Sequence, residues 1–149
     1  MPNHTQNKLH VSGKKSDIDK FLAYMGEDMD FEKVIPSPEN MFRDNLSQGD
    51  KERLESEGVP NWYDWQSENW GTKWNAYECE FRKENLIDDW FGLTYEFLTA
   101  WSTPEPVIRK LILDWPDLEI SGGWIDEGYE GCGSFCDFWP DERKTFLFV

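Results

Sequence analysis

The 149-residue sequence has few cysteines, few basic residues and no long apolar run. Three cysteines cannot form a complete set of disulfides, so we expect an intracellular, reducing compartment. No apolar stretch approaches the roughly 18 residues that span a bilayer, and residues 1–8 have no apolar signal-peptide core. The sequence therefore excludes a disulfide-rich secreted protein and a membrane span, and it predicts a cytoplasmic protein.

Basic residues are half as numerous as acidic ones. The 15 Lys and Arg stand against 30 Asp and Glu, which gives a net charge of −15. Such a field repels nucleic acid and anionic membranes and attracts basic surfaces. We therefore expect neither direct nucleic-acid binding nor membrane binding. A purely solubilising role for the acidity stays open at this point.

Aromatic side chains supply much of the apolar volume. The sequence contains nine Trp, ten Phe and five Tyr, each able to bury roughly 150–250 Å². A chain of this composition can build a core and is not of the disordered class. Its length suits one domain.

The hydrophobic patterning predicts a mixed α+β chain. Residues 7–12 alternate and predict a half-buried strand. Residues 16–25 and 103–115 carry apolar stripes with helical spacing, and Ser16 and Thr103 are the expected N-caps. Further strands are expected at 31–35, 73–81, 92–99, 118–125, 134–138 and 144–149, and Gly122 with Gly123 suggests a bulge or bend in the fourth of these.

This order of elements is the split βαβ pattern of a ferredoxin-like sandwich. We predict a single ferredoxin-like domain over residues 1–149, with α+β class. A helical insertion lies between the two repeats, at about residues 39–71. One or two extra strands are added at the C-terminal end.

Segments 2–13, 34–38, 61–76, 99–106, 115–118 and 129–131 resemble the YubB-like proteins, which contain a ferredoxin-like domain. The most specific match is at residues 61–76, and within it chance is a poor explanation for residues 69–76. One departure is Thr103, where that family often has proline. The resemblance implies the fold and a plasmid or phage context in bacteria. It implies no activity, cofactor or catalytic residue, so none is carried over.

Motifs for catalysis and cofactor binding are scarce. Cys132 and Cys136 form one loose pair, without the second pair of a structural zinc site. The glycines in 128–133 lack the order of a dinucleotide fingerprint, and neighbouring acids would repel phosphate. We expect no catalytic residue, no cofactor and no metal. A small hydrolase that uses a carboxylate pair, such as Asp126–Glu127, remains an open alternative.

Charge is unevenly distributed along the chain. Residues 1–43 are nearly neutral, residues 44–103 hold thirteen acids against five basic residues, and residues 114–142 hold nine acids with no Lys or Arg. Aromatic residues lie between the acids of this last segment, and in interfaces aromatics anchor while carboxylates steer. A solvated face would show the same pattern. The predicted partner-binding residues are Asp114, Asp117, Glu119, Trp124, Asp126, Glu127, Tyr129, Glu130 and Asp137.

These observations favour a binding protein over an enzyme. Host nucleases and surveillance complexes hold nucleic acid in channels lined with Arg and Lys, which an acidic chain can occupy. We expect a mobile-element protein that binds and inhibits a basic, nucleic-acid-handling host defence protein or nucleoprotein complex. It would be of anti-CRISPR or anti-restriction type, acting as a DNA mimic or a steric plug. The alternative is a plasmid or phage accessory protein whose acidity serves only solubility.

Overall fold

The computed structural model describes residues 3–129 and 131–141. A five-stranded antiparallel sheet has the order β2-β3-β1-β4-β5. The strands are β1 (His4–Lys14), β2 (Tyr77–Ile87), β3 (Trp90–Ala100), β4 (Glu119–Asp126) and β5 (Cys132–Ser134). The helices are α1 (Lys15–Met25), α2 (Phe31–Val34), α3 (Gln48–Glu57), α4 (Trp62–Asn69), α5 (Glu105–Asp114) and the 3-10 helix η1 (Phe135–Phe138).

The topology is ferredoxin-like and α+β, as predicted. β1 lies between β3 and β4, and β2 lies beyond β3. α1 follows β1, and α5 connects β3 to β4, so each helix links two strands of the repeat. The predicted insertion separates α1 from β2, and β5 is an added strand at the far edge of the sheet.

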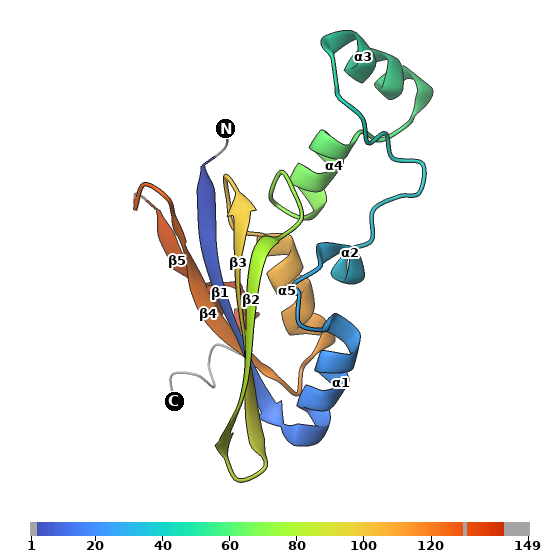
Figure 1. The fold of residues 1–149 in the computed structure, drawn as a ribbon. Coiled ribbons are helices and arrows are strands. Elements are labelled where there is room, and N and C mark those ends of the chain that lie inside the picture. Colours follow the sequence, from blue (N-terminus) through green and yellow to red (C-terminus); the bar gives the residue numbers. More distant parts are fainter. Residues whose placement is uncertain (1–2, 130, 142–149) are drawn as a thin grey trace.

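The helices α1, α2 and α5 lie on the same side of the sheet (Figure 1). The two predicted apolar stripes face inward: Phe21 of α1 and Leu111 of α5 are fully buried. Leu9 of β1 and Tyr95 of β3, which are register partners, are buried against them. The Tyr95 hydroxyl donates a 2.7 Å hydrogen bond to the Gly26 carbonyl, where α1 ends. The core therefore occupies one face of the sheet, and the described helices leave the other face open.

The strand predicted at 31–35 is wrong, because the chain forms the short helix α2 there. The Asp30 side chain caps this helix by accepting from the Glu32 amide. Phe31 and Val34 are both buried, and a spacing of three residues brings them to one face of a helical turn. A short apolar run shows too few residues to separate this spacing from strand alternation.

The strand predicted at 134–138 is also corrected, because only β5 and then η1 occur in this region. Ser134 accepts from the Cys136 amide, which starts η1. The expected caps at Ser16 and Thr103 are not used, and the Thr103 hydroxyl donates instead to Asn7 at 2.8 Å. The strand predicted at 144–149 lies outside the described residues.

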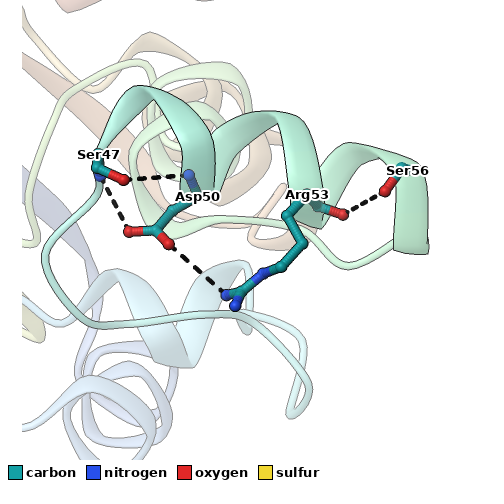
Figure 2. A network of polar contacts seen from close by, with 4 residues as sticks. All are labelled: Ser47, Asp50, Arg53 and Ser56. Carbon is teal, nitrogen blue, oxygen red and sulfur yellow. Dashed lines mark hydrogen bonds and ion pairs between the residues drawn. The ribbon is translucent and has the colours of Figure 1, made fainter.

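The insertion projects from the sheet as a helical arm, which carries α3 and α4 (Figure 1). α3 is held largely by its own local contacts, which Figure 2 shows. Ser47 and Asp50 form a capping box, and Arg53 lies 3.8 Å from the Asp50 carboxylate. Leu54 is the one buried residue of α3. Between α4 and α3, the Phe42 carbonyl accepts a 2.9 Å hydrogen bond from the Trp62 amide, so the chain enters and leaves the outer part of the arm at one place.

Replacing residues 45–58 by a flexible Gly/Ser linker should leave the domain folded. The hydrogen bonds of Trp62 remain, because its indole donates to the Asp44 carbonyl and its amide donates to the Phe42 carbonyl. The excised helix buries only Leu54, so little apolar burial is lost. We expect a thermal midpoint within a few degrees of the wild type. A large drop, or loss of cooperative unfolding, would show that α3 supports the core.

Candidate functional site

The open face of the sheet forms a groove of about 680 Å³ across β1, β2, β3 and β4. Side chains of β1 form its floor, because alternate residues of a strand point away from the core. Glu78 and Glu80 of β2 contribute to one side, and Ile125 of β4 to the other. We call this the acidic groove. It is lined by Gln6, Lys8, His10, Glu78, Glu80, Glu96, Leu98, Gly123, Trp124, Ile125 and Gly133, and by parts of Asn7, Phe97 and Gly122.

The lining is negatively charged. Three glutamates face one lysine, and that lysine is already engaged, since Lys8 lies 3.3 Å from the Glu96 carboxylate. Glu80 is the register partner of Glu96 across the β2–β3 pair, so two carboxylates lie side by side. Within the described residues, neither Glu78 nor Glu80 forms an ion pair. Glu78 and Glu80 thus have no salt-bridge partner among these residues, although Arg82 lies beside Glu80 and Glu96 on the same face of the sheet.

His10 adds no positive charge to the groove at neutral pH. Partial burial lowers the pKa of the His10 imidazole, and the positive charges of Lys8 and Arg82 lower it further. Its Nδ1 lies 3.1 Å from the Thr94 hydroxyl on β3. The imidazole therefore serves as a neutral hydrogen-bonding group, and the groove keeps its negative character.

Glycines let neighbouring strands come close along the β4 side of the groove. Gly122 has a φ of +112°, and a Cβ there would lie 1.9 Å from the Lys8 carbonyl oxygen. A Cβ on Gly123 would lie 2.5 Å from the Gly133 carbonyl oxygen of β5. The pairing of β4 with β1 is continuous from Thr5 to Ser12, so the expected bulge is absent from this register. The glycines instead permit close approach of the backbones.

One end of the groove opens onto a rim formed by the strand ends. His4 begins β1, and its Nδ1 forms a short hydrogen bond with the Tyr77 hydroxyl of β2. The His4 amide donates 3.0 Å to the Glu127 carboxylate, just after β4. Trp74 packs edge-on against Tyr77, with the ring centroids 6.2 Å apart. β1 thus ties the ends of β2 and β4 together at this rim.

The structure divides the predicted partner-binding residues into two groups. Asp114, Asp117 and Glu119 lie near the start of β4, where Glu119 pairs with Ser12. Trp124, Asp126, Glu127 and Tyr129 lie near its other end, beside the groove and its rim. Glu119 and Asp126 are the first and last residues of β4, roughly 23 Å apart at about 3.3 Å per residue. Asp137 lies in η1, and Glu130 is outside the described residues.

The carboxylates of β2 were not among the predicted site residues. Glu78, Glu80, Arg82 and Glu84 occupy alternate positions of β2, which is the signal for one exposed strand face. The acidic run at 114–142 is the more prominent signal in the sequence, because it contains nine acids and no Lys or Arg. Only the strand order brings the β2 acids beside Lys8 and Glu96.

Over residues 3–129 and 131–141, no group of three His, Cys, Asp or Glu side chains could hold a metal ion. The described helices also include none that is long and apolar enough to cross a membrane. The three cysteines are free thiols, and burial raises the pKa of Cys79.

Residues 69–137 match a protein family described as the ferredoxin-like domain in Api92-like protein. The matched region runs from the end of α4 into η1 and includes β2, β3, α5, β4 and β5. It supports a ferredoxin-like family and does not support the YubB-like assignment. No curated protein and no solved structure matches the chain. The chain therefore contains a ferredoxin-like region similar to the one found in Api92-like proteins.

Proposed function

We propose that this chain is a non-catalytic binding protein whose acidic groove takes a positively charged segment of a partner protein. The observation that carries the proposal is the groove itself, an uncovered sheet face with three glutamates and one paired lysine. Its volume of about 680 Å³ suits a bound side chain or short segment. Its negative charge favours Lys and Arg by electrostatic complementarity.

The exposure of the groove carboxylates favours binding over catalysis. A carboxyl group that acts as a general acid near neutral pH needs a raised pKa, which burial usually supplies. The Glu78 and Glu80 side chains are exposed to solvent. Exposed carboxylates attract cations, which suits steering and docking of a basic partner.

The biological setting of the proposal is that of a mobile element in a bacterial cytoplasm. The match of residues 69–137 to the ferredoxin-like domain in Api92-like protein supports a phage-related setting. Host proteins that cut or survey nucleic acid carry basic channels, and a chain of net charge −15 suits them as a partner. The proposed role is inhibition of such a host defence protein, by occupying or obstructing its nucleic-acid channel.

Salt should control how fast the partner binds. The immobilised chain would first capture its partner from bacterial lysate, and the association rate of the purified pair would then be measured. Raising salt from about 0.05 M to about 0.5 M shortens the Debye length severalfold, so we expect the association rate to fall by about tenfold or more. The partner should also lose nucleic-acid binding in the complex. Equal association rates at both salt concentrations would rule out electrostatic capture and leave acidity as a solubility feature.

A further inference from the structure

Two exposed aromatic residues lie in the turns just beyond the strand ends that border the groove, and both stand on unusual backbone. Trp101 follows β3 with a φ of +73°, and Tyr129 follows β4 with a φ of +56°. L-residues with side chains this large seldom adopt this region, which favours Gly and Asn. Holding them there costs about 1–3 kcal/mol each, and such strain concentrates at binding sites.

Both side chains are nevertheless directed into solvent. Trp101 is 58% exposed and Tyr129 is 77% exposed, so neither conformation is explained by burial in the core. Trp and Tyr are also the residues most often found to anchor protein interfaces. The combination of backbone strain and exposed aromatic surface points to a role outside the folding of the domain.

The topology brings the two residues to the same end of the sheet. The Trp101 amide donates to the Asn3 carbonyl, and the Glu127 amide donates to the carbonyl of His4, each at 2.9 Å. The start of β1 therefore lies between the two turns. Because neighbouring strands are about 4.8 Å apart, the turns lie roughly 10 Å from each other across β1. Glu127 lies in the second of these turns, and its carboxylate accepts from the His4 amide.

Other aromatic rings of this chain already form cation–π contacts with basic side chains. Lys73 lies 4.9 Å from the centre of the Trp74 ring, and Arg109 lies 5.1 Å from that of Phe138. Over the described part of the chain, no lysine or arginine lies over Trp101 or Tyr129. These two rings are thus available to a cation from a partner. A guanidinium group stacks on such rings more readily than an ammonium group and pairs with a carboxylate in the same plane.

We propose that Trp101 and Tyr129 form an arginine-selective rim, which makes the acidic groove prefer partner segments that carry arginine over those that carry lysine. This inference rests on the proposed function of the groove and names the side chain that it selects. The groove carboxylates attract arginine and lysine alike. The exposed aromatic rings favour arginine over lysine.

The test compares two unstructured peptides of equal length and charge, one built on arginine and one on lysine. Wild type should bind the arginine peptide about fivefold more tightly, because a guanidinium group stacks on an aromatic ring more readily than an ammonium group does. The double variant Trp101→Ala, Tyr129→Ala should lose this preference and keep its affinity for the lysine peptide. Leu113→Ala, which removes a side chain that is 65% exposed on α5, is the matched control and should bind as wild type.

Tyr129→Asn is a second rim variant, because asparagine tolerates a positive φ and should preserve the turn. It should halve the logarithm of the ratio between the affinities for the arginine peptide and the lysine peptide. Equal binding of both peptides by wild type, or an equal loss of both in the rim variants, would overturn the arginine-selective rim while leaving the groove intact. Unchanged binding of both peptides by Glu78→Lys, Glu80→Lys would instead contradict the groove function.

Discussion

Reversing Glu78 and Glu80 to lysine is expected to slow association with a basic partner by about tenfold or more at low salt. The two substitutions change the net charge from −15 to −11, because each replaces −1 by +1. They do so within the groove, where Lys8 would then be joined by two further cations. The association rate measured by surface binding at low salt is the readout.

The matched control is Glu55→Lys, Glu57→Lys on α3, which also gives a net charge of −11. Both residues belong to α3 on the projecting arm (Figure 1), and neither lines the groove. If the groove is the binding site, the control should retain most of the wild-type rate. Equal slowing in both variants would show that total charge, rather than the groove, governs association.

The β2 positions suit this experiment better than the acids at the end of β4. Both glutamates are exposed and lack an ion pair with any described residue, so their replacement should leave the unfolding free energy almost unchanged. Glu127, by contrast, accepts from the His4 amide, and the Asp126 amide pairs with Gly131 in the turn. Replacing Asp126 and Glu127 by lysine would therefore change the structure of the turn as well as the electrostatic field, and the two effects on association could not be told apart.

The fold was predictable because its strongest signals are local and periodic. The stripes of α1 and α5 require only residues three and four positions apart, and their burial is confirmed by Phe21 and Leu111. The same rule fails for α2, since four residues span a single turn. Its helical form depends on distant groups as well: the Phe31 amide donates to the side chain of Asn75, 44 residues away.

The site was less predictable because strand order decides which charges become neighbours. The acids of 114–142 are adjacent in sequence, but β4 carries Glu119 and Asp126 to opposite ends of the sheet. Glu80 and Glu96 belong to different strands, and the β2–β3 register places them opposite each other. A one-residue shift would turn these side chains to the other face of the sheet. Sequence spacing alone does not determine that register.

Gly122→Ala is expected to be the most destabilising substitution among these variants. The added Cβ would lie 1.9 Å from the Lys8 carbonyl oxygen, a contact with backbone that no side-chain rotation can relieve. A φ of +112° also lies in a region that residues other than glycine rarely adopt. Separating β4 from β1 would break the centre of the sheet, so we expect a loss of about 4 kcal/mol or more. The thermal midpoint should fall by roughly 10 °C or more.

Gly58→Ala is the control that tests a positive φ in the absence of a steric clash. Gly58 ends α3 with a φ of +71°, and an added Cβ would have no atom within 4 Å. Its cost of about 1–2 kcal/mol should appear as fraying of the arm, because α3 does not share the core of the sheet. The global midpoint should therefore stay close to the wild-type value. If Gly122→Ala also unfolds at the wild-type midpoint, the close approach of β4 to β1 is wrong. If its midpoint falls as expected, the glycine is required to hold β4 and the groove residue Ile125 against β1.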